Sequence, residues 1–205
     1  MVGVPDIMST LEQRATAVKL VCFDFDGVFT ARNQVICGWS EQQGYFEQVT
    51  CSRADGIGLD RLRALGVHLA VISTEPNPVV KARCEKLKIA CYQGIADKRF
   101  TMEKLAAYHG ISLAECAFLG NDVNDLEALR AVGLPALVAD CESALYPAER
   151  LILSRNGGEG AVREFCDWIA DIKERAPLRI NPHPAPYVEA LKAAHWDSIS
   201  QMGHD

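Results

Sequence analysis

The sequence lacks the marks of a membrane or exported protein. No apolar stretch approaches the roughly 20 residues that a helix needs to cross a bilayer. The segment 1–13 contains Asp6 and Glu12 and does not combine a basic region with an apolar one, as a secretory signal would. We therefore expect no membrane partner and predict a cytoplasmic location.

Paired metal-binding cysteines are also missing. The chain has eight cysteines, but none belongs to a C-x-x-C pair and no histidine stands at zinc-ligand spacing. Cys22, Cys91 and Cys116 lie inside apolar runs, where a free thiol packs like a small hydrophobic side chain. We predict reduced core thiols, not a disulfide framework or a zinc site.

The chain has no excess of positive charge. Its 21 lysines and arginines are scattered and are outnumbered by 27 aspartates and glutamates, which gives a net charge of −6. A nucleic-acid partner is therefore not expected. With 205 residues, of which 49% are hydrophobic, the chain is long enough for one domain with a well-formed core.

Short apolar runs alternate with helical patterns along most of the chain. Runs that are bounded by Gly, Pro, Asp or Asn are typical of buried parallel strands. This alternation predicts an α/β fold, a doubly wound parallel sheet of the Rossmann-like type. We expect strands at 18–25, 68–73, 89–93, 116–120, 136–139 and 151–154, and helices at 58–65, 78–87, 98–109 and 125–132.

Two segments depart from the alternation. Residues 30–51 contain two β-prone stretches separated by a polar one, which predicts a β-hairpin flap inserted after the first strand. Residues 176–205 contain several prolines, so we expect a tail that is disordered or docks on a neighbour. We therefore divide the chain into a domain at 1–175 and a Pro-rich tail at 176–205.

The most informative motif is F-D-F-D-G-V at the end of the first predicted strand. Alternation along the strand places Asp24 and Asp26 on the same side of the chain, at the sheet edge where α/β proteins bind ligands. Two close carboxylates indicate either a divalent cation, for which Mg²⁺ is the natural choice, or a matched acid/base couple. A solvated turn is the alternative, but Asp24 has apolar neighbours.

Polar residues follow three further strands. Ser73 and Thr74 come after the second apolar strand, Lys98 follows the third, and the motif G-N-D-V-N-D occupies 120–125. A hydroxyl and a lysine suit a phosphoryl group, although each also fits a helix cap or an exposed position. Their joint occurrence at the same predicted edge favours a site.

In this order the motifs resemble those of the haloacid dehalogenase-like phosphatases, over roughly residues 18–169. The resemblance is greatest to the branch without a large cap domain. That branch includes 3-deoxy-octulosonate 8-phosphate phosphatases, nonulosonate 9-phosphate phosphatases and the phosphatase-like domain of some acylneuraminate cytidylyltransferases. The motifs R-A-D-G-I-G at 53–58 and G-G-E-G-A-V-R-E at 157–164 resemble that branch specifically.

The resemblance implies a role for each catalytic candidate. Asp24 would be the nucleophile that forms an aspartyl-phosphate, and Asp26 the general acid and then the base. Ser73 and Lys98 would hold the oxygens of the transferring phosphoryl group. The resemblance also implies Mg²⁺ as the cofactor.

The implied metal ligands are Asp24, the main chain of Asp26, and the 120–125 loop through Asn121 and Asp122. Most relatives carry an aspartate where this chain has Asn121. An amide oxygen can coordinate a hard cation, but the loss of one negative charge is expected to weaken Mg²⁺ binding. Asp122 or Asp125 could compensate.

Substrate selection is expected near the second strand end. Octulosonate phosphatases usually carry Gly-Arg after the serine, whereas this chain has Thr74 and Glu75. Glu75, followed by Lys86, resembles the nonulosonate phosphatases, in which such a pair contributes to substrate selection. The candidate substrate-binding residues are Thr30, Asp55, Thr74, Glu75, Arg83 and Lys86.

These features favour a Mg²⁺-dependent phosphatase of a keto-deoxy sugar acid, most readily a nonulosonate 9-phosphate. The alternatives are a 3-deoxy-octulosonate 8-phosphate phosphatase and a non-catalytic, phosphatase-like oligomerisation domain associated with an acylneuraminate cytidylyltransferase. The resemblance also implies a homotetramer assembled through the flap, in which Trp39, Tyr45 and Phe46 are candidate contacts.

Overall fold

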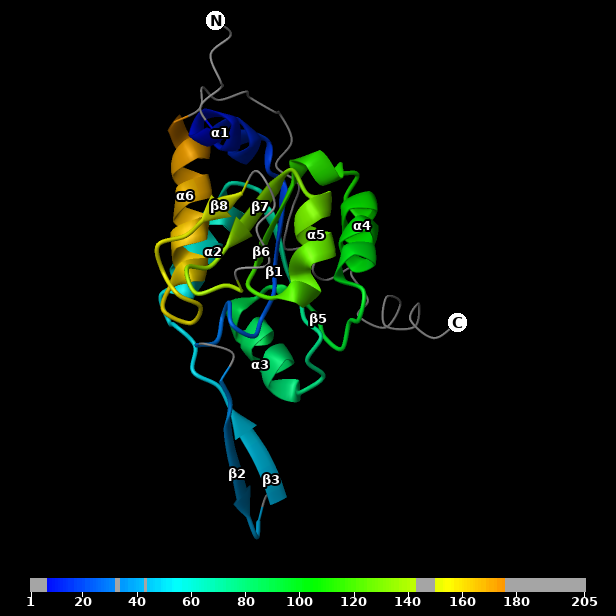
Figure 1. Ribbon diagram of the computed structural model, residues 1–205, viewed down its shortest axis with the longest axis vertical. Coiled ribbons are helices and arrows are strands. Elements are labelled where there is room, and N and C mark those ends of the chain that lie inside the picture. Colours follow the sequence, from blue (N-terminus) through cyan, green and yellow to red (C-terminus); the bar gives the residue numbers. More distant parts are fainter. Residues whose placement is uncertain (1–6, 32–33, 43, 143–149, 176–205) are drawn as a thin grey trace, which may run out of the picture.

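The computed structural model describes residues 7–31, 34–42, 44–142 and 150–175 (Figure 1). The Pro-rich tail at 176–205 lies outside the described residues, so the expectation for it stays a prediction. None of the described helices is both long and apolar enough to cross a membrane.

In the described part of the chain, six parallel strands form one sheet in the order β5-β4-β1-β6-β7-β8. The chain reverses its direction of winding beside β1, which lies between β4 and β6. The predicted doubly wound parallel sheet is therefore confirmed. The strands are β1 Leu20–Phe23, β4 His68–Ile72, β5 Ala90–Tyr92, β6 Cys116–Gly120, β7 Leu134–Leu137 and β8 Leu151–Ile152.

Helices cover both faces of the sheet (Figure 1). One face packs against α1 Ile7–Ala17, α2 Asp55–Ala64, α3 Pro78–Leu87 and α6 Ala161–Arg175, and the other against α4 Lys98–Tyr108 and α5 Leu126–Ala131. Strand β1 supplies both cores by alternation, with Val21 and Phe23 on the first face and Leu20 and Cys22 on the second. Burial on both faces explains why β1 is a nearly continuous apolar run.

Two helices were not among the sequence-based expectations. Helix α1 precedes β1, and α6 follows the 157–160 loop. In α6, Val162, Phe165, Cys166 and Ile169 share one buried face at helical spacing, so the amphipathic signal was present in the sequence.

A β-hairpin projects from the domain on the side where β1 has its carboxyl end (Figure 1). It pairs β2 Ile36–Ser40 with β3 Gly44–Gln48 in antiparallel register, and an isolated bridge between Thr30 and Cys51 closes its base. The flap predicted at 30–51 is therefore present. The described residues contain no larger insertion, as expected for a protein without a large cap domain.

Most of the cysteines pack in the core as predicted, but Cys37 is exposed and Cys51 and Cys141 are only partly buried. All eight lie within the described residues, and no disulfide joins any of them. Cys22, Cys91 and Cys116 are buried in the two cores, where burial raises the pKa of Cys22 and Cys116 above the ordinary value. These thiols therefore contribute to packing.

Two histidine rings stack near the amino end of β4, whereas the predicted site lies at the carboxyl ends of the strands. His68 begins β4 and His109 ends α4, and their ring centroids are 3.9 Å apart. Burial lowers the pKa of both, and that of His109 falls to about 4, with the charge of His68 as the second cause. The environment of both rings therefore favours their neutral forms.

This preference predicts a loss of stability in mild acid. In the unfolded chain a histidine binds a proton below about pH 6.5, whereas folded His109 stays neutral to about pH 4. The free energy of unfolding should therefore fall as the pH drops from about 6.5 towards 4, and less steeply in His109→Gln than in the wild type. Urea unfolding of both proteins at pH 7 and pH 5 measures this difference. An equal loss in both would contradict the assignment.

Candidate active site

The carboxyl ends of three neighbouring strands place the candidate catalytic residues together. Asp24 follows β1, Ser73 follows β4, and Asn121 follows β6, while Lys98 begins α4. The main-chain N–H of Asp24 donates to the carbonyl of Leu119 at 3.0 Å, so the pairing of β1 with β6 continues past the end of β1. The predicted convergence at one sheet edge is therefore present.

Lys98 bridges two buried carboxylates. Its Nζ lies 2.7 Å from Oδ1 of Asp24 and 2.7 Å from Oδ1 of Asp125. The exposed fractions of these side chains are 1%, 5% and 0%. Burial, and after it the charge of Asp125, raises the pKa of Asp24, whereas Lys98 lowers it. One cation faces two anions, so the site favours a further positive charge.

Asp125 also holds the loop after β6. Its Oδ2 accepts from the main-chain N–H groups of Asn121 at 2.9 Å and Asp122 at 3.3 Å. A Cβ at Gly120 would approach the Asp125 carboxylate to 2.5 Å, so glycine is needed there. From the sequence, Asp125 is expected only as a possible substitute ligand, although its place in the G-N-D-V-N-D motif gives a signal for a role in the site.

The side chain of Asn121 faces the candidate cation position. Its amide lies 2.9 Å from the main-chain oxygen of Asp26 and 3.3 Å from Oδ2 of Asp24. With the amide nitrogen turned inward, Asn121 donates to both oxygens. With the amide oxygen turned inward, three oxygen atoms converge, which is stable only around a cation.

This donor set fits Mg²⁺. It combines a carboxylate, a main-chain carbonyl and an amide, all hard oxygen ligands. Among the described residues no group of three or more His, Cys, Asp and Glu side chains is arranged to hold a metal. The candidate ligands at this site contain only one such side chain, that of Asp24. The carboxylate of Asp122 instead accepts from the N–H of Val123 at 2.6 Å and caps the following turn.

The loop that carries Asp26 is supported from two sides. The N–H of Gly27 donates to Oγ1 of buried Thr30 at 2.9 Å. The N–H of Gly158 donates to the carbonyl of Val28 at 3.0 Å. A Cβ at Gly157 would come within 1.8 Å of the Gly27 carbonyl oxygen, so the 157–160 motif packs backbone against backbone. This contact explains why the motif contains glycines.

The Asp26 carboxyl has an acidic environment. Burial is the main cause that raises its pKa, and the charges of Glu75 and Glu47 raise it further. Lys98 and a hydrogen bond with Thr30 act in the opposite direction. The net rise favours the protonated form of this carboxyl.

Glu75 and Glu47 are held by the same residue. The N–H of Asn77 donates to Oε1 of Glu75 at 2.8 Å, and its Nδ2 donates to Oε2 of Glu47 at 2.7 Å. The Oγ of buried Ser73 accepts from the N–H of Glu75 at 3.0 Å. Glu47 lies on β3 of the flap and was not singled out from the sequence, since no local pattern connects it with residues 28 positions away.

The other predicted substrate residues make different contacts. Thr74 lies 3.5 Å from Nδ2 of Asn124 across the strand ends. Arg83 donates to the carbonyl of Ser52 at 2.8 Å and so ties α3 to the segment after the flap. Lys86 is exposed on the last turn of α3, whereas Glu75 precedes the first turn. Within one chain the structure therefore does not bring Lys86 and Glu75 together.

Asp55 is buried at the start of α2. Its Oδ1 accepts from the N–H of Arg163 at 3.3 Å, which links α2 to α6. Burial raises its pKa to about 6, partly offset by that hydrogen bond. A substrate role for Asp55 stays a prediction.

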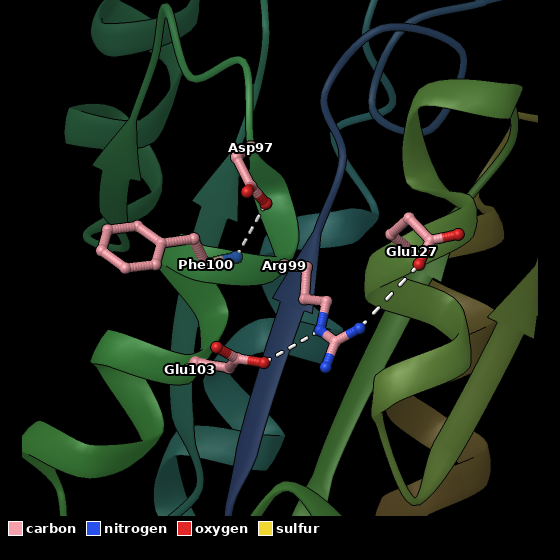
Figure 2. A pocket seen from close by; sticks show the side chains of 5 residues that line it. All are labelled: Asp97, Arg99, Phe100, Glu103 and Glu127. Carbon is pink, nitrogen blue, oxygen red and sulfur yellow. Dashed lines mark hydrogen bonds and ion pairs between the residues drawn. The ribbon is translucent and has the colours of Figure 1, made fainter.

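Figure 2 shows a separate surface pocket between α4 and α5. Its arginine, Arg99, forms ion pairs with Glu103 at 2.9 Å and with Glu127 at 3.9 Å. Because its one cation is already paired with two exposed carboxylates, this pocket provides no catalytic arrangement comparable with that at the strand ends. Its lining residues are Asp97, Arg99, Phe100, Glu103 and Glu127.

The role of Asp125 can be tested by stability. Asp125→Ala leaves Lys98 with one partner fewer and two N–H groups without their acceptor, so we expect a loss of about 3–5 kcal/mol in the free energy of unfolding. Glu127→Ala, which removes an exposed acid nearby, should cost less than about 1 kcal/mol. Urea unfolding measures the free energy of unfolding of both variants. Equal losses would show that Asp125 does not hold Lys98 and the loop after β6 in place.

Comparisons with known proteins identify relatives over most of the chain. No family model matches the chain. The 3-deoxy-D-manno-octulosonate 8-phosphate phosphatase KdsC of Yersinia pestis is 30% identical over 158 residues, which cover 77% of this chain and 82% of that protein.

Solved structures of similar fold include phosphatases of the same kind. One is the 3-deoxy-D-manno-octulosonate 8-phosphate phosphatase from Moraxella catarrhalis in complex with magnesium, phosphate and KDO. It is 32% identical, with a TM-score of 0.75 and coverage of 82% of this chain and 94% of that one. Another is a probable YrbI family phosphatase from Pseudomonas syringae, which is 37% identical, with a TM-score of 0.74 and coverage of 80% and 92%. The chain therefore belongs to the haloacid dehalogenase-like phosphatases, hydrolases of phosphomonoesters, and resembles their 3-deoxy-D-manno-octulosonate 8-phosphate phosphatases.

Proposed function

We propose that this chain is a Mg²⁺-dependent phosphatase of a phosphorylated 3-deoxy keto sugar acid. The observation that carries the proposal is the position of Asp24, whose carboxylate lies between Lys98 and the oxygen ligands at Asp26 and Asn121. A relative of known structure holds magnesium, phosphate and a keto sugar acid. When bound, Mg²⁺ supplies positive charge between the nucleophile and the phosphoryl oxygens.

The chain's own residues would perform the reaction in two steps. An oxygen of Asp24 attacks phosphorus, the bond from phosphorus to the ester oxygen breaks, and Asp26 gives its proton to the departing alcohol. Water then attacks the aspartyl-phosphate, Asp26 accepts a proton from it, and Asp24 and phosphate are released. Ser73 and Lys98 position the phosphoryl oxygens and offset their charge.

For the sugar acid, we propose a nine-carbon nonulosonate 9-phosphate over the eight-carbon compound named for the relatives. The support is Glu75, which stands after Ser73 at the strand end and has a hydrogen-bonded carboxylate suited to accept from substrate hydroxyls. The candidate substrate residues Thr30, Thr74, Arg83, Lys86 and Asp55 belong to this proposal.

We also propose a cytoplasmic homotetramer assembled through the flap. Ile36, Trp39 and Tyr45 are 60%, 71% and 61% exposed on the hairpin, an unusual exposure for large apolar side chains. A second candidate function, that of an oligomerisation domain associated with an acylneuraminate cytidylyltransferase, is favoured by the neutral side chain of Asn121, which lowers the negative charge of the cation site, and by the Pro-rich tail at 176–205.

Phosphate release tests the main proposal. With Mg²⁺, the wild type should release phosphate from 3-deoxy-octulosonate 8-phosphate or a nonulosonate 9-phosphate, and faster from the latter. Asp24→Asn should lower the rate at least about 1,000-fold, because it removes the nucleophile. Asp60→Asn, which neutralises an exposed acid on α2, should leave the rate unchanged. No release from either compound by the folded protein would favour the oligomerisation domain.

The ligand role of Asn121 gives a separate prediction. Asn121→Asp adds a negative charge at the cation position, so Mg²⁺ should bind at least about tenfold more tightly. Asn124→Asp adds the same charge to an exposed position of the same loop and should have a much smaller effect. Isothermal titration calorimetry with Mg²⁺ compares the three proteins. Equal affinity in the wild type and Asn121→Asp would show that Asn121 is not a ligand.

A further inference from the structure

The flap brings a carboxylate to the catalytic edge of the sheet. Glu47 lies near the end of β3, half-buried, where its Oε2 accepts from Nδ2 of Asn77 at 2.7 Å. Asn77 is itself fixed, because its Oδ1 accepts from the N–H of Val79 at 3.0 Å and caps α3. The position of Glu47 relative to the body of the domain is therefore defined by a capped helix end.

Glu75 is held by the same asparagine. Its Oε1 accepts from the main-chain N–H of Asn77 at 2.8 Å, and its own N–H donates to buried Ser73 at 3.0 Å. Asn77 thus holds the carboxylates of Glu47 and Glu75, which lie far apart in the sequence. We call Glu47 and Glu75 the acidic clamp.

The acidic clamp lies at the strand end that carries Ser73, because the main-chain N–H of Glu75 donates to the Oγ of Ser73 at 3.0 Å. The charges of both glutamates also raise the pKa of the Asp26 carboxyl, after burial as the main cause. The hydrogen-bond donors to the clamp carboxylates are neutral groups: the amide and the N–H of Asn77, and the hydroxyl of Tyr45, 2.5 Å from Oε1 of Glu47. Their negative charges therefore remain available to a substrate.

We propose that Glu47 of the flap is a specificity-determining residue, which together with Glu75 accepts hydroxyl groups and rejects a carboxylate near the phosphoester. The inference rests on the proposed function and deepens it. In a 3-deoxy keto acid phosphorylated on its last carbon, the carboxylate is at the far end of the chain and hydroxyls stand next to the ester. Carboxylate oxygens accept hydrogen bonds from such hydroxyls and repel a second anion.

Two small esters isolate this effect. sn-Glycerol 3-phosphate and 3-phosphoglycerate share a three-carbon chain, and the former carries a hydroxymethyl group where the latter carries a carboxylate. The experiment measures kcat/KM for both esters with Mg²⁺ and takes the ratio of the two values. The wild type should prefer sn-glycerol 3-phosphate.

Glu47→Gln should lower this ratio about fivefold, because it removes one unit of charge near the ester. Glutamine keeps an oxygen that accepts from Asn77, so the link between the flap and α3 remains. Glu41→Gln is the matched control: it removes the same charge from an exposed position at the hairpin turn and should leave the ratio unchanged.

The outcomes separate the two proposals. An unchanged ratio in Glu47→Gln, an equal fall in both rates, or a wild-type preference for 3-phosphoglycerate would overturn the specificity role alone. Absence of Mg²⁺-dependent turnover of an aryl phosphate by the wild type would overturn the proposed function, and the specificity role with it.

Discussion

The buried contact of Lys98 with Asp24 and Asp125 is the interaction on which the site depends. It joins the start of α4 to the ends of β1 and of the loop after β6, at 2.7 Å to each carboxylate. Because charges this deeply buried are costly unless they are paired, the three residues fix one another's positions. Together these three side chains carry one more negative than positive charge, so the site favours the binding of a cation.

The loops around this contact are shaped by backbone packing. Gly157 lies against the carbonyl of Gly27, and Gly120 lies against Asp125, so neither position accepts a side chain. Asn121 then presents its amide to Asp24 and to the main chain of Asp26. An amide can donate to these oxygens or join them as a ligand, so this side chain suits the site with and without a cation.

Much of the fold could be predicted from the sequence, because the strands of the parallel sheet are short apolar runs, several of which have a polar residue just beyond the carboxyl end. β1 and β6 are the clearest examples, and the strand ends predicted Asp24, Asp26, Ser73, Lys98 and Asn121 as one cluster. Contacts between distant segments could not be predicted. Glu47 reaches Asn77 only because the returning strand β3 ends close to the start of α3, and Asp125 turns inward only because the loop after β6 closes around it. Pairing of Glu75 with Lys86 was inferred from resemblance, and the length of α3 separates them within one chain.

Membership of the haloacid dehalogenase-like phosphatases and the geometry at the sheet edge lead to one central claim, that Asp24 accepts the phosphoryl group beside Mg²⁺. The most direct test is a crystal structure of the protein grown with Mg²⁺ and beryllium fluoride, a mimic of an aspartyl-phosphate. We expect beryllium bonded to a carboxylate oxygen of Asp24, with Mg²⁺ coordinated by Asp24, the carbonyl of Asp26 and the amide oxygen of Asn121. A structure with neither species at this edge of the sheet would contradict it.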